Sequence, residues 1–525
     1  FGSSFRLVRE YALLQQRRSG RPRSPSCARA MSAPSEEIYL FVNPKSGGNK
    51  GQDFLKVPQP FLSYVEDGRL VALHIFSLID PAQRAAGFAK LKAATDAARR
   101  RIRTIVGGGD GTVMWVDSEA AKVGIDTPKR LAYGIVPLGT GNDFSRVAGW
   151  GGKNPKKILD NDFHALRNLL KLWCKASWRP HDVWNASLEV DESEGQIFKV
   201  VDKSEEQQSG TTLSMPFINY FSIGQESQVG VNFDKYRTRS QTCNLFVYAC
   251  SGVTTQMNCR KIQHVADLIS GLHAGADVDA PVLFGYDEEH DLPQIMGNPE
   301  SLMFLNVNSY AGGMGRFWQQ DADYGTDPHP PPEEVDVGAD PGDGRLEVVT
   351  LPCIVDIALD MVSHEAKRVH SGGPYYLEFF GPPEGYDCQE IYGEIDGEFF
   401  HLVNPLVAHV TFTKRLQVLQ NMDDPDIAEW KQYLSPSVWM AQGADVVEGA
   451  GQTIAGGVST LVGAVATSVT SGATGVVKAP VHWANGVQRT IGQWTSGKSA
   501  ARELAANAGP DSPGSPDMRA SSSGE

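Results

Sequence analysis

Three glycine-rich stretches of this chain carry hydroxyl and carboxylate side chains at short spacings. They are Asn43-Pro44-Lys45-Ser46-Gly47-Gly48, Gly107-Gly108-Gly109-Asp110-Gly111-Thr112 and Pro137-Leu138-Gly139-Thr140-Gly141-Asn142-Asp143. Glycine tolerates positive φ and has no side chain, so backbone N–H groups in such turns can crowd around a phosphate. The hydroxyls of Ser46, Thr112 and Thr140 add further donors. Asp110 and Asp143 supply the oxygen ligands that a hard divalent cation needs, and this combination suits metal-assisted phosphoryl transfer.

Apolar runs typical of buried β-strands precede all three stretches, at residues 38–42, 102–106 and 133–136. A further strand is predicted at 71–78, and a segment rich in Ala, Lys and Arg predicts a helix at 82–101. Strands that alternate with helices predict a parallel sheet, whose ligands bind beyond the carboxyl ends of the strands. Because the three glycine turns stand at such ends, we expect them to face one site.

The sequence pattern changes beyond about residue 180. Long polar or proline-rich connections separate short strand-like runs, which predicts a mainly antiparallel second domain. The clearest runs are 217–223, 302–307, 346–351, 375–380 and 407–413.

Composition excludes some classes of function. The chain has 525 residues and a formal net charge of -14, which argues against a nucleic-acid partner because phosphate backbones are held by clustered Lys and Arg. The same charge means that any contact with an anionic membrane must be local. The seven cysteines form no C-x-x-C pair and show no zinc-ligand spacing, so we expect buried free thiols in a reducing, cytoplasmic compartment.

The three turns resemble, in order and at similar spacing, the nucleotide-site motifs of diacylglycerol kinases. Further segments resemble that family in the second half of the chain: Asn219-Tyr220-Phe221-Ser222-Ile223-Gly224, Asn306 to Gly313, Asp343 to Val349 and Ile395-Asp396-Gly397-Glu398. The resemblance covers roughly residues 38 to 415. It implies a NAD-kinase-like parallel-sheet α/β domain followed by a mainly antiparallel β-sandwich domain, with the active site in the cleft between them.

The sequence divides into five segments, of which the two that the resemblance covers take their roles from it. We expect a leader or disordered segment (1–36), an α/β ATP-binding domain (37–180), a β-rich accessory domain on the lipid side (181–422), a tail rich in Gly, Ser, Thr and Val (423–508) and a disordered end (509–525).

The implied activity is transfer of the γ-phosphoryl group of ATP to the free hydroxyl of diacylglycerol, with Mg²⁺. The residues expected to contact the nucleotide are Asn43, Pro44, Ser46, Gly47, Gly108, Gly109, Asp110, Gly111, Thr112, Gly139, Thr140, Gly141, Asn142 and Asp143. Asp110 and Asp143 are the expected magnesium ligands. Asp340 and Asp343 resemble a structural magnesium loop of bacterial relatives, with a plain acidic turn as the alternative.

Three acids compete for the role of general base: Glu398, Asp396 and Asp110. A general base must lie within ~3 Å of the proton that it accepts. A carboxylate bound to Mg²⁺ is a poor base, because the cation holds it ionised and occupied. We therefore favour Glu398, then Asp396, and assign Asp110 to the metal or the nucleotide.

Two departures from the family pattern keep alternatives open. Gln225-Glu226 stands where the family usually has an aspartate, so a carboxylate is present at this place only if Glu226 substitutes for that aspartate. Phe399-Phe400 stands where the family usually has Pro-Trp. The alternatives are a sphingosine or ceramide kinase and a catalytically silent lipid-binding scaffold. Asp143 after Asn142 favours the diacylglycerol group, and the intact phosphate turns argue against a scaffold.

Apolar residues recur at steps of three or four, or multiples of these, through the tail, and no charged residue stands between Glu448 and Lys478. We expect an interfacial helix within 446–495 that brings a cytoplasmic enzyme to a membrane surface. A disordered or protein-packed tail and a membrane-spanning segment are the alternatives. The P-loop-like match at 492–499 is rejected, because too little chain follows to build a sheet around it.

No oligomeric state is predicted.

Overall fold

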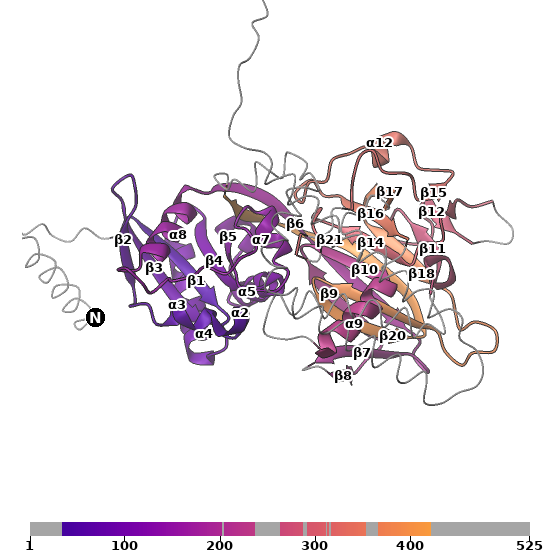
Figure 1. Ribbon diagram of the computed structural model, residues 1–525, viewed down its shortest axis with the longest axis horizontal. Helices are drawn as coiled ribbons and strands as arrows, with labels where there is room; N and C mark the ends of the chain where they lie inside the picture. The colour runs from indigo at the N-terminus through magenta and orange to yellow at the C-terminus, as the bar shows by residue number, and fades with distance from the viewer. Residues whose placement is uncertain are drawn as a thin grey trace, which may run out of the picture. The chain divides into compact units, whose positions relative to one another are not determined.

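The computed structural model describes residues 34–201, 204–236, 263–286, 291–310, 312–313, 317–352 and 366–421 (Figure 1). All of them belong to one compact unit, Phe1–Tyr433. The predictions made for the leader before residue 34, for the tail and for the P-loop-like match lie outside the described residues.

The first part of the fold is a mostly parallel sheet with helices on both faces. Its strands run in the order β5-β4-β1-β3-β2 (Figure 1), and only β2 at the edge is antiparallel to its neighbour. The strands are β1 (Glu36–Val42), β2 (Phe61–Tyr64), β3 (Leu70–Ser77), β4 (Ile102–Gly108) and β5 (Leu131–Pro137). The helices are α2 (Ser46–Asn49), α3 (Gly51–Leu55), α4 (Pro81–Ala97), α5 (Asp110–Lys122), α6 (Thr127–Arg130), α7 (Asp143–Val147) and α8 (His164–Lys175). The predicted parallel α/β domain is confirmed.

Strand β1 shows why both faces of this sheet must be covered. Its side chains alternate between two hydrophobic clusters, so that Leu40 packs with α8 residues such as Leu170 on one face. Phe41 packs on the other face, stacked on Phe88 of α4 with ring centroids 4.3 Å apart. A strand that is buried on both faces reads as a continuous apolar run, which is the pattern that the sequence shows.

Helix α4 begins as the sequence indicates but ends earlier. The Asp80 side chain caps its first turn by accepting hydrogen bonds from the backbone N–H groups of Ala82 and Gln83. The prediction that the helix reaches residue 101 is wrong, because Ala98 is extended. The guanidinium group of Arg130 binds the carbonyl oxygens of Thr95 and Ala98, and so satisfies the end of the helix from another element.

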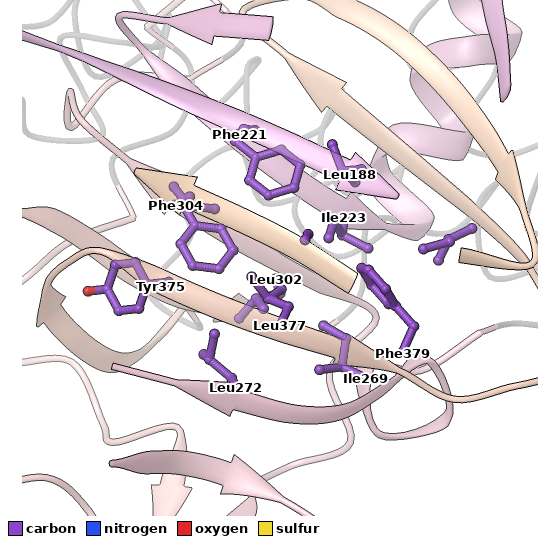
Figure 2. Close-up of a cluster of buried hydrophobic side chains, with 14 of the residues drawn as sticks. Leu188, Phe221, Ile223, Ile269, Leu272, Leu302, Phe304, Tyr375, Leu377 and Phe379 are labelled. Atoms are coloured by element: carbon purple, nitrogen blue, oxygen red, sulfur yellow. The ribbon is translucent and has the colours of Figure 1, made fainter. Parts of the chain in front are cut away.

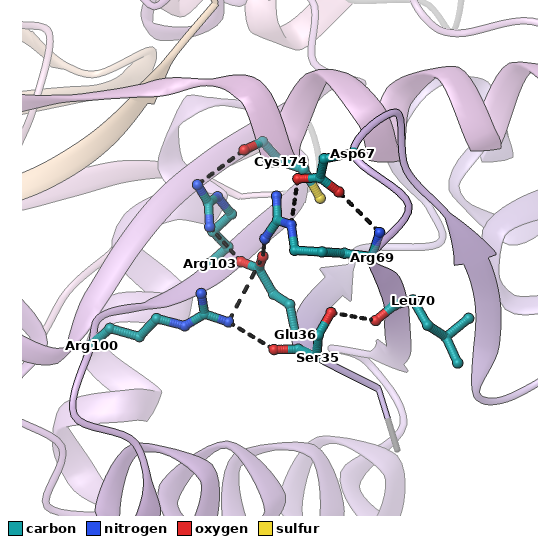
Figure 3. Close-up of polar contacts among 8 residues, drawn as sticks. All are labelled: Ser35, Glu36, Asp67, Arg69, Leu70, Arg100, Arg103 and Cys174. Atoms are coloured by element: carbon teal, nitrogen blue, oxygen red, sulfur yellow. Dashed lines mark hydrogen bonds and ion pairs between the residues drawn. The ribbon is translucent and has the colours of Figure 1, made fainter. Parts of the chain in front are cut away.

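The amino end of β1, opposite the glycine turns, is held by an arginine cluster (Figure 3). The Glu36 carboxylate is 5% exposed and pairs with Arg69 at 2.7 Å and with Arg103. Arg103 also donates to the carbonyl oxygen of Cys174 at the end of α8, over 3.1 Å. A buried carboxylate is stable only when it is paired in this way, so the cluster ties β1 to β3, β4 and α8.

The second part is a sandwich of two sheets. The α/β sheet continues into it as β21, which is parallel to β5 at Val418 and Tyr133 and antiparallel to β18 and β6, giving 11 strands in all. The other sheet has 8 strands in the order β17-β16-β14-β10-β19-β20-β7-β8. The strands of this part are β6 (Ser177–Val190), β7 (Gln196–Val201), β8 (Ser204–Gln207), β9 (Thr212–Phe217), β10 (Tyr220–Gly224), β11 (Ile269–His273), β12 (Val282–Gly285), β13 (Gln294–Ile295), β14 (Ser301–Leu305), β15 (Thr326–Asp327), β16 (Leu346–Leu351), β17 (Lys367–Gly372), β18 (Tyr375–Phe379), β19 (Glu390–Ile395), β20 (Glu398–Val403) and β21 (Pro405–Gln420). Its helices are α9 (Gln225–Tyr236), α11 (Val265–Leu268) and α12 (Pro332–Val335).

Side chains from the two sheets meet in one hydrophobic core (Figure 2). Phe221 and Phe304 stack across β10 and β14 with ring centroids 5.4 Å apart, and Phe304 also contacts Tyr375 of the facing sheet at 5.3 Å. This layer confirms the predicted antiparallel sandwich.

The run predicted as one strand at 217–223 is two strands. Phe217 ends β9 and Tyr220 begins β10. The chain turns between them because the backbone N–H groups of Ile218 and Asn219 point toward the Asp396 carboxylate instead of a neighbouring strand.

Candidate active site

The three glycine turns lie side by side, because they follow the adjacent strands β1, β4 and β5 at the same edge of the sheet. Backbone hydrogen bonds tie each turn to the next. The N–H of Asn43 donates to the carbonyl oxygen of Gly107 over 2.8 Å, and the N–H of Leu138 donates to that of Gly108 over 3.0 Å. The structure therefore brings together the residues that were expected to surround the phosphates.

Glycine is required where the turns touch. A Cβ atom at Gly139 would lie 2.6 Å from the Cα atom of Gly109. A Cβ atom at Gly108 would lie 2.3 Å from the Thr112 hydroxyl oxygen, which folds back over the turn. Gly47 has a φ of +63°, and a Cβ atom there would approach the Leu138 carbonyl oxygen to 3.2 Å. The spacing of these glycines thus reflects backbone packed against backbone.

The Asn142 side chain closes the third turn. Asn142 is 1% exposed with a φ of 60°. Its Oδ1 atom accepts from the N–H of Gly139 at 2.8 Å, and its Nδ2 atom donates to the carbonyl oxygens of Gly139 and Gly152, each at 3.0 Å. These bonds give Asn142 a structural role in the turn, and its contact with a nucleotide stays a prediction.

Asp143 joins the third turn to the second part of the fold through Ser309, Gly312 and Gly313, which together with Tyr310 we call the Ser309 segment. The carboxylate is 2% exposed. Its Oδ1 atom accepts from the Ser309 hydroxyl at 2.6 Å and from the Gly313 N–H at 3.0 Å, and its Oδ2 atom accepts from the Gly312 N–H at 2.9 Å. Three of the roughly four acceptor positions of a carboxylate are thereby used, which leaves little capacity for a metal ion.

Asp110 is the acid with open capacity in these turns. Its Oδ2 atom accepts from the backbone N–H of Asp143 at 2.9 Å, while its Oδ1 atom is buried without a hydrogen-bond partner among the described residues. Burial, and then the negative charges of Asp143 and Asp396, raise the pKa of Asp110 to about 8. A buried oxygen without a partner is costly unless a ligand satisfies it. This atom therefore fits a cation or a donor supplied by a bound nucleotide.

The described residues hold no group of three or more His, Cys, Asp or Glu side chains that could ligate a metal ion. Mg²⁺ commonly binds one or two carboxylates and takes its remaining ligands from phosphates and water. Asp110 fits that pattern better than a closed protein cage would.

Asp396 and Glu398 stand in the hairpin between β19 and β20, and they differ in how they are engaged. The Asp396 carboxylate accepts the backbone N–H groups of Ile218 and Asn219, each at 2.8 Å, and of Tyr220 at 3.1 Å. Burial is the main cause that raises the pKa of Asp396 to about 7, against the lowering effect of these bonds.

Glu398 is exposed and faces the second glycine turn. A Cβ atom at Gly111 would lie 3.8 Å from its Oε1 atom. Within the described part of the chain its carboxylate receives no hydrogen bond, so both oxygens are open to a substrate. The structure therefore brings Asp110, Asp143, Asp396 and Glu398 to one place, and among them Glu398 is the accessible base candidate.

Asp340 and Asp343 lie in a turn, where Asp340 has an arginine side chain as partner and Asp343 has a backbone N–H group. The Asp340 carboxylate pairs with Arg179 at 3.0 Å and accepts the N–H of Gly342 at 2.9 Å. Asp343 accepts the N–H of Arg345 at 2.9 Å. Both acids thus have partners within the protein, and a structural magnesium loop and a plain acidic turn both stay predictions for them.

Arg146 of α7 is a site residue that sequence reasoning missed. Its Nε atom donates to the carbonyl oxygen of Gly141 at 3.4 Å. A Cβ atom at Gly152 would lie 2.1 Å from its Nη2 atom, and one at Gly313 would lie 3.1 Å from its Cδ atom. The guanidinium group thus lies against the third turn and the Ser309 segment. Its position three residues after Asp143, in the first turns of a helix, was the available signal.

Glycine turns that converge at strand ends, followed by an antiparallel sandwich, form the architecture that the resemblance implied. Residues 37–171 match the model of the diacylglycerol kinase catalytic domain, and residues 216–399 match that of the diacylglycerol kinase accessory domain. Human diacylglycerol kinase theta is 28% identical over 301 residues, which cover 54% of this chain and 26% of the human protein. Diacylglycerol kinase 1 of Oryza sativa subsp. japonica is 27% identical over 316 residues, which cover 54% of this chain and 60% of the rice protein.

The chain belongs to the diacylglycerol kinase family. It spans less than two thirds of the length of these curated relatives, with 26% of the human and 60% of the rice protein covered. The crystal structure of a diacylglycerol kinase from Bacillus anthracis str. Sterne aligns at 16% sequence identity with a TM-score of 0.35, covering 74% of this chain and 97% of that chain. No helix among the described residues is long and apolar enough to cross a membrane.

The contact between the second and third turns predicts a cost for a single methyl group. We expect Gly139→Ala to lower the free energy of unfolding by about 1–3 kcal/mol, because the added atom must push two backbones apart. Gly338→Ala is the matched control, since a Cβ atom there would meet nothing within 4 Å. Urea unfolding monitored by tryptophan fluorescence measures both. Equal midpoints for the two variants would show that the turns do not touch.

Proposed function

We propose that this protein transfers the γ-phosphoryl group of ATP to the free hydroxyl of diacylglycerol, giving phosphatidic acid and ADP. The observation that carries the proposal is the buried, unpartnered Asp110 Oδ1 atom among three packed glycine turns. Such a constellation suits a charged phosphate with its cation, and membership of the family supports the choice of lipid. No contact in the described residues favours sphingosine or ceramide as the acceptor, or a silent scaffold.

The proposed nucleotide site consists of the backbone N–H groups of the three turns, with Asp110 as the residue that would hold Mg²⁺. Bound there, Mg²⁺ would neutralise phosphate oxygens and so stabilise the charge of the transition state. Asp143 then acts as a positioning residue, since its carboxylate is occupied by the Ser309 segment. Arg146 lies beside the third turn and supplies a fixed positive charge for the transferred group.

We assign the general base to Glu398. The lipid hydroxyl oxygen bonds to the γ-phosphorus as the bond from that phosphorus to the bridging oxygen of ADP breaks, and the hydroxyl proton passes to the Glu398 carboxylate. Asp396 fixes the hairpin by holding the three N–H groups between β9 and β10. An exposed carboxylate facing the second turn suits the role of base, whereas Asp396 has one acceptor position left.

The activity is tested with purified protein, Mg-ATP and mixed micelles that contain diacylglycerol, sphingosine or ceramide. We expect phosphorylation of diacylglycerol alone. Gly109→Asp should abolish turnover, because a Cβ atom there already lies 3.3 Å from the Cα of Gly139 and the added carboxylate repels phosphate. Gly338→Asp, at an open position, is the control for added charge. Turnover of sphingosine or ceramide, or unchanged activity of Gly109→Asp, would contradict the proposal.

Glu398→Gln and Asp396→Asn separate the two acids of the hairpin. Glu398→Gln should lower kcat by about 10²–10⁴-fold, the range for loss of a general base, with unfolding unchanged. Asp396→Asn should lower the free energy of unfolding by about 1–3 kcal/mol, because an amide NH₂ group cannot accept the backbone N–H groups. Kinetics and urea unfolding of both variants provide the measurement. Retained kcat in Glu398→Gln would move the base assignment to Asp396.

We further propose that the protein associates peripherally with a membrane surface through residues 446–495, which lie outside the described residues. The sequence supports this, since apolar residues recur at helical spacing in a stretch without charge. Deletion of residues 440–525 should release the protein from liposomes that contain diacylglycerol while sparing activity on a short-chain soluble diacylglycerol. Unchanged liposome sedimentation of the truncated protein would rule the proposal out.

A further inference from the structure

Two glutamates form a buried acid pair behind the proposed active site. Glu226 lies in the first turn of α9 and is 2% exposed, and Glu394 of β19 is 3% exposed. One hydroxyl, that of Tyr310, binds the Glu226 Oε1 atom and lies 3.3 Å from the Glu394 Oε2 atom, so the two carboxylates are adjacent. Burial, and then the nearby Glu226 charge, raise the pKa of Glu394 well above its ordinary value. Two adjacent buried carboxylates without a cation avoid a double negative charge by sharing one proton.

The groups that surround this acid pair are hydroxyls. Strand β10 supplies Tyr220 and Ser222, and α9 supplies Ser227, whose hydroxyl donates to the Glu226 Oε2 atom at 3.0 Å. From β14, the Ser301 hydroxyl accepts the backbone N–H of Glu226 at 3.1 Å. No lysine, arginine or histidine in the described ranges is a partner of either glutamate. The next charged groups are the acids of the site, Asp110, Asp143 and Asp396, which act electrostatically on Tyr220.

Tyr310 connects the acid pair to the Ser309 segment. Its hydroxyl donates to the Glu226 Oε1 atom and lies 3.3 Å from the Glu394 Oε2 atom. Tyr310 also stands next in sequence to Ser309, whose hydroxyl binds the Asp143 carboxylate. The backbone N–H of Asp143 in turn binds the Asp110 Oδ2 atom. A continuous chain of hydrogen bonds and backbone therefore runs from the acid pair to Asp110.

The same acid pair reaches the Asp396 hairpin by a second route. The Tyr220 hydroxyl donates to the Glu394 Oε1 atom at 3.3 Å, and the Tyr220 backbone N–H donates to the Asp396 carboxylate at 3.1 Å. Both sides of the proposed site thus depend on tyrosine hydroxyls that the two glutamates hold. Tyr310 is 5% exposed, and its ring also packs against those of Tyr220 and Phe317, with centroids 5.0 and 5.3 Å away.

We propose that Glu226 and Glu394 act as a proton-sharing positioning pair, which fixes Tyr310 and thereby seats the Ser309 segment on Asp143 in the geometry required for phosphoryl transfer. The inference rests on the proposed function for its kinetic consequence. Loss of the shared proton leaves two adjacent negative charges without a cation, so Tyr310 loses its place and the segment separates from Asp143. Activity should therefore fall as pH rises through the raised pKa of Glu394.

The sign of the effect on stability follows from linkage. The folded state keeps a proton on Glu394 that the unfolded chain releases near the ordinary glutamate pKa, because folding raises the pKa of Glu394. The unfolded state thus binds fewer protons, and stability falls as pH rises from that ordinary value through the raised one. Below the ordinary value the contribution of the pair is fully present.

The test uses Glu394→Gln, whose amide can donate to Glu226 without a titrating proton. We expect this variant to show a smaller fall in kcat with rising pH than the unmodified protein, measured from about pH 6 to about pH 10. Tyr310→Phe should lower kcat at least about tenfold, with a smaller change in KM for ATP. Tyr375→Phe is the matched control, because it removes a buried hydroxyl that donates to the Leu346 carbonyl oxygen in the sandwich core. It should leave kcat and the pH profile unchanged.

A second readout does not need activity. The full chain should lose stability to urea as pH rises, and Glu394→Gln should lessen that loss, while the part due to Asp110 and Asp396 remains. A fall in kcat with rising pH that is as large in Glu394→Gln as in the unmodified protein, or a kcat of Tyr310→Phe equal to that of Tyr375→Phe, would overturn the inference. Should Glu394→Gln fail to fold, Glu226→Gln tests the same shared proton. Absence of any kinase activity would instead contradict the proposed function, and the pH dependence of unfolding would still decide about the acid pair.

Discussion

A single carboxylate, that of Asp143, holds the proposed active site together. Its three hydrogen bonds reach the Ser309 segment in the second part of the fold, while its own backbone N–H binds Asp110 in the second glycine turn. Because the group is almost fully buried, each of these donors also offsets the cost of keeping a charge away from water. Removing the carboxylate would leave buried donors unsatisfied on one side and the Asp110 turn without its partner on the other.

The sheet structure stabilises this contact between the Asp143 carboxylate and the Ser309 segment. Strand β21 belongs to the α/β sheet through β5 and to the sandwich through β18 and β6, so both parts share one hydrogen-bonded ladder. Adjacent side chains of this strand strengthen the connection. Lys414 pairs with Asp117 of α5, and Arg415 pairs with Asp182 of β6 at 2.5 Å. The glycine turn at the start of α5 is therefore anchored from the far end of the described chain.

The proposed site and its surroundings contain many acidic side chains and few basic ones, which shapes its chemistry. Asp110, Asp396 and Glu394 all have pKa values raised mainly by burial. Buried carboxylates in such number need protons, backbone donors or a cation. In this protein the three solutions are separated: Glu394 shares a proton with Glu226, Asp396 takes backbone N–H groups, and Asp110 keeps an open oxygen. The last of these is the feature that suits a metal–nucleotide ligand.

The residues themselves determined the strand–turn–helix pattern and the location of the glycine turns, since buried strands and phosphate turns have strong local signals in apolar runs and glycine spacing. Tertiary structure decided what the side chains in those turns do. Asn142 and Asp143 resemble ligand groups from sequence alone. In the structure the Asn142 side chain bonds to Gly139 and Gly152, and the Asp143 carboxylate bonds to the Ser309 segment. The engagement of Asp396, the openness of Glu398 and the pairing of Glu226 with Glu394 depend on residues up to 178 positions apart, such as Ile218 and Asp396. Hydrogen-bond partners this distant in sequence leave no periodic or local signature, so only the folded chain reveals them.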